Sequence, residues 1–249
     1  MWRSERSSGS NFKTGKVAKR YQNNICLSPG KREFTNRKAG TNMHISEGVL
    51  SGPVLISGAA LAAAGTAIGL KKLDYDHIAK AGILSAAFFV ASLIHVPIGP
   101  SSAHLILNGL VGLLLGWAAF PAILVALVLQ AMLFQFGGIT ALGVNTVIMA
   151  LPAVIGYHLF APWLSKGRKI ALAAAFACGF LAVLTGAVLV GLALRFTEES
   201  FLEVATLVVS AHIPVMVIEG IITAFCVAFL QKVQPSMLPG YKAGIGELR

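Results

Sequence analysis

Long apolar stretches alternate with short polar connections from residue 49 onward. An α-helix needs roughly 20 mostly apolar residues to cross the hydrocarbon core of a bilayer. Judged against that length, the pattern predicts seven membrane-spanning helices, at approximately 49–70, 79–97, 103–118, 121–136, 143–161, 169–194 and 204–230. The third and fourth are short and separated only by a turn near Pro121, so we expect them to be tilted or partly re-entrant. The predicted fold is an all-α polytopic membrane protein.

Basic residues are concentrated in two of the connections and give the predicted helices a direction. They are Lys71–Lys72 after the first span and residues 166–169 between the fifth and sixth. Because loops rich in Lys and Arg stay in the cytoplasm, we expect these connections and the C-terminus there, in a multi-pass protein of the plasma (cell inner) membrane. The polar stretches that then face the outside are 43–48, 97–104 and 137–145.

Residues 1–42 differ from the rest of the chain. They carry ten Lys and Arg against two Glu, a net charge of +8 out of +10 for the whole chain. They contain no apolar stretch of signal-peptide length, so the sequence predicts a basic disordered leader, or a wrongly assigned start, ahead of a transmembrane domain at 43–249. If Met43 lies outside, this leader of net charge +8 must also cross the membrane, against the tendency of basic segments to stay in the cytoplasm. A start at Met43 removes this conflict. Nucleic-acid binding is disfavoured because the basic excess belongs to the leader.

The composition excludes an ordinary soluble domain, because 56% of the residues are hydrophobic and only 12% are charged. Two pairs of glycines at four-residue spacing, Gly65/Gly69 and Gly112/Gly116, predict close approach of helix backbones in lipid. The chain contains neither a serine-nucleophile elbow nor a phosphate-binding loop. The residues give no support for an enzyme of either kind, and if transport needs ATP, another subunit must supply the hydrolysis.

Two histidines lie in the stretches predicted to face outside. If translation starts at Met43, its amine, the backbone nitrogen and imidazole of His44, and the imidazole of His104 offer four nitrogens to one metal ion. Such a set suits Ni(II) or Cu(II), with Co(II) also possible, and disfavours Mg and Ca. The alternative is that each histidine is an ordinary hydrogen-bonded structural residue.

Further polar residues could support such a site. Asn145 and Ser102 are predicted to orient the ligands, although both positions also suit a helix cap. His95, His212 and Glu219 are ionisable residues near or within apolar spans, which makes them functional candidates. We favour a structural role for these three, in a network between helices.

Four ordered motifs add a resemblance to these observations. They are MHISEG at 43–48, IGPSSAHLILNG at 98–109, FGGITALGVNT at 136–146 and AHIPVMVIEG at 211–220. From Met43 onward the chain resembles the CbiM/NikM family, the substrate-specific membrane subunits of cobalt and nickel energy-coupling-factor (ECF) transporters.

The resemblance implies a metal site made by Met43, His44 and His104. It implies import of Co(II), for cobalamin synthesis, or Ni(II), for metalloenzymes, with no bound cofactor. The implied partners are a transmembrane coupling subunit, two ATPase subunits and a small accessory membrane subunit. A vitamin-binding subunit of the same design, or a metal-independent secondary transporter, is the alternative.

Two departures from the family pattern leave the choice between nickel and cobalt open. Many relatives have a histidine where this chain has Phe136. Many also have Cys-Ser-His-Pro where this chain has Ser102-Ala103-His104-Leu105.

Overall fold

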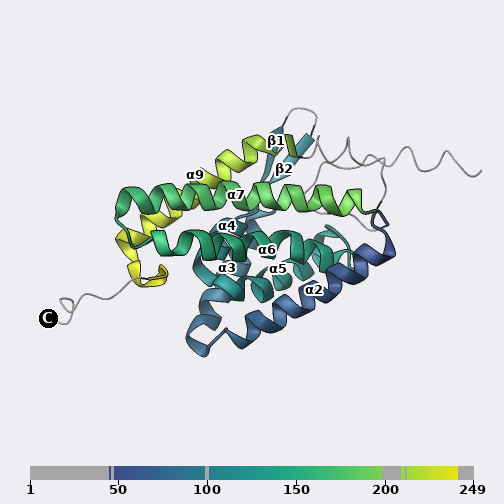
Figure 1. Cartoon of the computed structure of the whole chain (residues 1–249), viewed down its shortest axis with the longest axis horizontal. Coiled ribbons are helices and arrows are strands. Elements are labelled where there is room, and N and C mark those ends of the chain that lie inside the picture. The colour runs from purple at the N-terminus through teal and green to yellow at the C-terminus, as the bar shows by residue number, and fades with distance from the viewer. Residues whose placement is uncertain (1–44, 46–47, 99–100, 198–208, 211, 241–249) are drawn as a thin grey trace, which may run out of the picture. The chain divides into compact units, whose positions relative to one another are not determined.

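The computed structural model describes residues 45, 48–98, 101–197, 209–210 and 212–240. The leader and its predicted boundary at residue 42 lie outside these residues. Helices dominate the described part, together with one two-stranded hairpin (Figure 1). The elements are α2 (Gly52–Lys71), α3 (Tyr75–Ala91), β1 (His95–Ile98), β2 (Ser101–His104), α4 (Asn108–Leu115), α5 (Ala119–Phe134), α6 (Leu142–Phe160), α7 (Arg168–Arg195) and α9 (Ile213–Val233). Short 3-10 turns follow α4, α6 and α9, at Gly116–Ala118, Ala161–Trp163 and Pro235–Met237.

Apolar side chains point outward as well as inward, as expected for helices in lipid. Ile56 and Phe225 are each 73% exposed, whereas Ile123 and Met149 are fully buried. Within the described residues, five helical segments are long and apolar enough to cross a membrane, and α3 is a shorter apolar helix. The prediction of an all-α membrane protein is therefore confirmed.

The third and seventh predicted spans are corrected by the structure. Residues 103–107 end a β-hairpin and continue without regular structure, and only Asn108–Leu115 form a helix. Together with α5 this short helix makes one candidate span, Asn108–Phe134. The seventh span is predicted as one helix from residue 204, but His212 is a turn residue that precedes α9, so this helix begins at Ile213. Residues 204–208 lie outside the described residues. Apolar content cannot separate an extended buried segment from a helix, which is why the predicted start of the third span was wrong.

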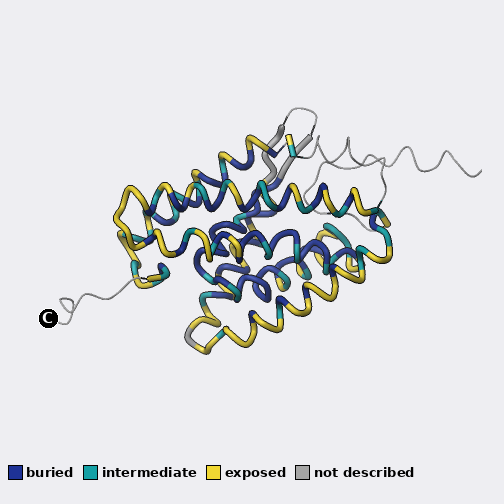
Figure 2. The backbone as a smooth tube through the Cα atoms, in the orientation of Figure 1, coloured by how far each residue is buried: buried dark blue, intermediate teal, exposed yellow. Residues whose placement is uncertain are grey.

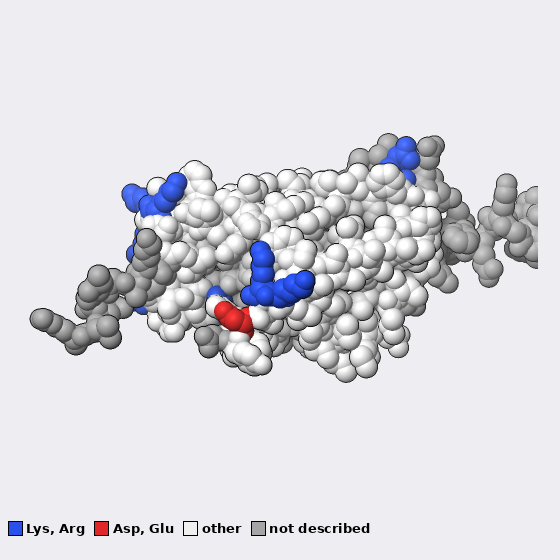
Figure 3. Space-filling view, turned by 60° about the horizontal axis from the view of Figure 1, so that its bottom comes forward, with Lys and Arg blue, Asp and Glu red and all other residues white. Residues whose placement is uncertain are grey.

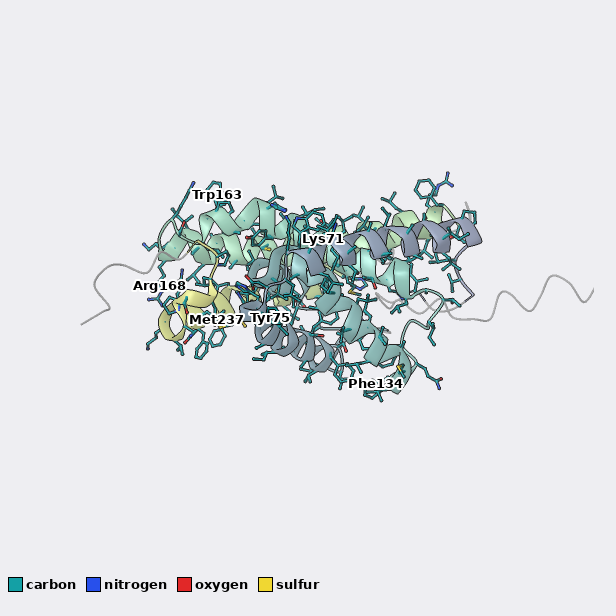
Figure 4. All side chains as sticks on the ribbon, turned by 90° about the horizontal axis from the view of Figure 1, so that it is seen from below. Lys71, Tyr75, Phe134, Trp163, Arg168 and Met237 are labelled. Carbon is teal, nitrogen blue, oxygen red and sulfur yellow. The ribbon has the colours of Figure 1, made fainter. Side chains whose placement is uncertain are left out.

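One end of the helix bundle, here called the basic end, carries the lysines after α2 and the residues around Arg168. The Lys72 amine lies 5.4 Å from the centre of the Trp117 ring, and the Lys80 amine donates to the Met237 carbonyl at 2.8 Å. Figure 4 shows Trp163, Arg168 and Met237 at this end and Phe134 at the other. Most of the face in Figure 3 between the basic groups is free of charge.

The first turn of α3 begins at this basic end with a capping carboxylate. Asp74 accepts a hydrogen bond from the His77 backbone nitrogen at 3.1 Å and also contacts the His77 ring. The hydrogen bond from the His77 side chain is the main reason why the pKa of Asp74 lies below its ordinary value. Such a cap satisfies a backbone donor that the helix itself leaves without a partner.

The short helix α4 lies inside the bundle, alongside α6. The Asn108 amide donates to the Met149 carbonyl at 3.4 Å, and a methyl group at Gly116 would contact the Tyr157 ring. These contacts advance together along both helices, so α4 and α6 run in the same direction. Because Met149 lies two turns into α6, the chain must enter the bundle before α4 begins. Irregular backbone is tolerated at membrane depth when protein covers it. Ile106 is fully buried here, and Figure 2 shows that the middle of the bundle is mostly buried.

The prediction of close backbone approach is confirmed at Gly112 and Gly69. A methyl group at Gly112 would lie 2.2 Å from the carbonyl oxygen of Ala153, and one at Gly69 would lie 2.5 Å from that of Trp117. At Gly65 the neighbour is instead the Phe120 ring, at 2.4 Å. The glycine pairs therefore fix the distance between α2, α4 and their neighbours.

Replacing Gly112 by alanine should destabilise the protein by about 1–3 kcal/mol, the usual cost of overpacking. The methyl group would meet backbone atoms of Ala153, which cannot rotate away as a side chain can. Thermal unfolding of the purified protein in detergent measures the effect. Gly82→Ala is the matched control, because a methyl group there has nothing within 4 Å. Equal midpoints for the two variants would contradict this packing argument.

Candidate metal centre

An asparagine clamp holds the chain directly after His44, where Met43 and His44 themselves lie outside the described residues. The Asn145 side chain accepts a hydrogen bond from the Ile45 nitrogen at 3.0 Å and donates one to the Ile45 carbonyl at 3.2 Å. Both residues are buried. Two bonds from one amide fix the position and direction of this backbone, much as a neighbouring strand would. The clamp therefore ties the segment next to His44 to the first turns of α6.

His104 is the last residue of β2 and is only 6% exposed. Its ring nitrogen Nδ1 lies 3.2 Å from the Leu105 carbonyl oxygen. A donated hydrogen bond there leaves the lone pair on Nε2, the arrangement found for most metal-binding histidines. The backbone of β2 pairs antiparallel with β1, and His104 is directly opposite His95.

One face of α6 connects the clamp with the segment that follows His104. Asn145 and Met149 are one helical turn apart, so they lie on the same face. Asn145 binds Ile45, and the Met149 carbonyl accepts the bond from Asn108, four residues after His104. The two stretches that carry the predicted ligands are thus attached to successive turns of one helix.

Glu219 of α9 also binds the segment that follows His104. This residue of α9 is fully buried, and its carboxylate accepts hydrogen bonds from the backbone nitrogens of Ile106 and Leu107. The bonds from Leu107 reach both carboxylate oxygens at 3.0 Å. We expected Glu219 to join a network between helices, and the structure corrects this expectation. Its partners are the backbone nitrogens of Ile106 and Leu107, two and three residues after His104. A lone acid in an apolar span was the signal for a functional residue, but the sequence did not show its partner.

The remaining predicted residues are placed as follows. Ser102 lies in β2 opposite Pro97, and its side chain is outside the described part, so its role stays a prediction. His95 lies in β1 rather than in a helix, which corrects the second predicted span. His212 is buried at the start of α9.

The described residues alone do not gather three or more His, Cys, Asp or Glu side chains around a possible metal position. A centre that includes His104 would consequently draw its other donors from backbone or terminal groups, or from residues outside the described part. Nitrogen donors of the kind predicted at Met43 and His44 meet this requirement.

Comparison with known proteins identifies the family. A family model described as the cobalt uptake substrate-specific transmembrane region matches residues 44–237. A protein of Haemophilus influenzae named "Putative metal transport protein" is 43% identical over 199 residues, which are 79% of this chain and 97% of that protein. The cobalt transport protein CbiM of Sorangium cellulosum is 31% identical, over 79% of this chain and 94% of its own length.

A fused relative and a solved structure agree with this result. The fused nickel transport protein NikMN of Rhodobacter capsulatus is 33% identical over 81% of this chain and 65% of its own length. A crystal structure of a truncated transition metal transporter superposes with a TM-score of 0.62, at 31% identity, over 76% of this chain and 98% of that one. The chain therefore belongs to the CbiM family of cobalt-uptake transmembrane proteins and is a membrane component of cobalt or nickel transport.

Proposed function

We propose that this chain is the substrate-binding transmembrane subunit of an ECF-type importer and captures Co(II) or Ni(II) at Met43, His44 and His104. The observation that carries the proposal is the pair of buried attachments on α6. One fixes Ile45, directly after His44, and the other fixes Asn108, shortly after His104. A fixed separation between ligand-bearing segments is what selective metal binding needs, because each metal prefers its own coordination geometry.

The proposed donors are four nitrogens. They are the Met43 amine, the His44 backbone nitrogen, the His44 imidazole and Nε2 of His104. This set suits a square-planar Ni(II) ion, and Co(II) accepts the same donors. Asn145 acts by holding Ile45, and Ser102 is proposed to orient His104 from within β2.

Import requires partners, because the chain has no phosphate-binding loop of its own. We propose a transmembrane coupling subunit, two ATPase subunits and a small accessory membrane subunit. The fused NikMN relative supports the last of these, since its name joins an M part to an N part. The metal site would face the outside of the cell membrane and the basic end the cytoplasm, as the distribution of Lys and Arg indicates. Release then requires a second state with lower metal affinity.

Calorimetric titration of the purified protein beginning at Met43 tests the proposal. We expect tight binding of one Ni(II) or Co(II) and none of Mg(II), which prefers oxygen donors. Binding should weaken as the pH falls, because protonated imidazole cannot coordinate a metal. Absence of Ni(II) and Co(II) binding would refute the proposal and favour a vitamin carrier or a metal-independent transporter.

A further inference from the structure

The carboxylate of Glu219 meets an unusual piece of backbone. Leu107 has a φ angle of +55°, one of two positive values among the described residues other than glycine. A bulky residue rarely adopts this left-handed conformation, and it persists only where the surroundings enforce it. The Leu107 nitrogen donates to both oxygens of Glu219 at 3.0 Å, so the carboxylate is placed to enforce it.

The same carboxylate lies at the start of α4. Leu107 immediately precedes this helix, and its carbonyl accepts the first helical hydrogen bond, from Val111 at 2.9 Å. A negative charge is favourable at a helix N-terminus because the free N–H groups there carry partial positive charge. Glu219 therefore stabilises the point at which the extended segment from His104 turns into a helix.

Burying a carboxylate inside an apolar membrane helix, as at Glu219, costs free energy. Glu219 is fully buried in an apolar helix. Its own backbone packs against Gly179 of α7, where a methyl group would lie 2.7 Å from the Glu219 carbonyl oxygen. A carboxylate is retained at membrane depth when it serves a site or a structural need. Among the described residues its partners are the two backbone amides that follow the His104–Leu105 pair.

We infer that Glu219 is a positioning residue for the metal site: through Ile106 and Leu107 it sets the location of His104. The inference rests on the proposed role of His104 as a ligand. In this arrangement α6 positions the segment near His44, whereas α9 positions the segment that carries His104. Movement of α9 relative to α6 would change the separation of the two segments and hence the affinity for the ion.

Three variants test the inference in the protein that begins at Met43. Glu219→Ala removes both acceptors from the N–H groups of Ile106, which is buried, and Leu107, which is partly buried. We expect Ni(II) affinity to fall about 10- to 100-fold, as for the loss of other residues that orient metal ligands. Glu219→Gln keeps one oxygen acceptor and should lose less. Thr223→Val is the matched control, because Thr223 is equally buried one turn further along α9 and Val has its shape.

Hydrogen exchange of the peptide containing Ile106 and Leu107, measured without metal, gives a second readout. We expect faster exchange in Glu219→Ala and wild-type rates in Thr223→Val. The inference is overturned if Glu219→Ala keeps wild-type affinity, or if Thr223→Val loses as much as Glu219→Ala. If the wild-type protein binds no metal while Glu219→Ala still accelerates exchange, the proposed function fails but the positioning of the segment stands.

Discussion

Replacing His104 by alanine should reduce Ni(II) or Co(II) affinity more than a hundredfold while leaving a folded protein. Loss of a residue that only supports a ligand already costs about 10- to 100-fold, and loss of the ligand itself should cost more. The fold should survive because the substitution leaves the backbone of the following segment and its hydrogen bonds to Glu219 in place. Calorimetry gives the affinity, and thermal unfolding in detergent gives the stability.

His158→Ala is the control for this experiment. His158 lies in the last turn of α6 and packs against the rings of Trp117 and Tyr157 at the basic end, far along α6 from Asn145. Its removal should leave metal affinity unchanged. Tight binding by the His104→Ala protein would sink the assignment of His104 as a ligand, whatever its stability.

The helices were predictable because hydrophobic length alone defines them in a membrane. The α2, α6 and α7 helices lie close to the predicted ranges, and the glycine spacing correctly indicated close contact at Gly112. The segment before α4 was not predictable in this way. Its residues are as apolar as a helix, but their backbone hydrogen bonds go partly to Glu219, and no periodicity in the sequence reports a partner 112 or 113 residues away.

The support of the candidate site was only partly predictable. An asparagine at the start of an apolar span fits a helix cap as well as a site, and composition does not separate the two. The structure shows the Asn145 side chain bound to Ile45, 100 residues distant. The common physical reason is that irregular backbone inside a membrane protein must be satisfied by side chains, and the pairing is decided by packing.

The two supports also explain why capture and release could be separate events. Asn145 and Glu219 stand on different helices, and each binds the backbone close to a different proposed metal ligand, His44 or His104. A rigid site would bind the ion equally in both states and could not release it. Supports on two helices allow the distance between the segments to differ between states, which is the property that the proposed coupling to an ATPase requires.

The form that begins at Met43 should bind Ni(II) or Co(II) tightly, and the form that retains residues 1–42 should not. In the longer chain the nitrogen of Met43 is part of a peptide bond, so it is no longer an amine that can coordinate a metal. We expect a loss comparable to that of His104→Ala, measured by calorimetry on both forms side by side.

A third form carries a single alanine ahead of Met43, left by protease cleavage of a fusion. It distinguishes the effect of losing the free Met43 amine from the effects of the leader's size and its net charge of +8. It should bind as weakly as the long form if the position of the amine is what matters. Tight binding by the Met43 form and the alanine form, but not by the long form, would mean that the leader obstructs the site by its size or charge. Equal binding by all three forms would mean that the amine is dispensable. The centre would then have to be built from His104 and other side chains, and the clamp on Ile45 would serve the fold rather than the ion.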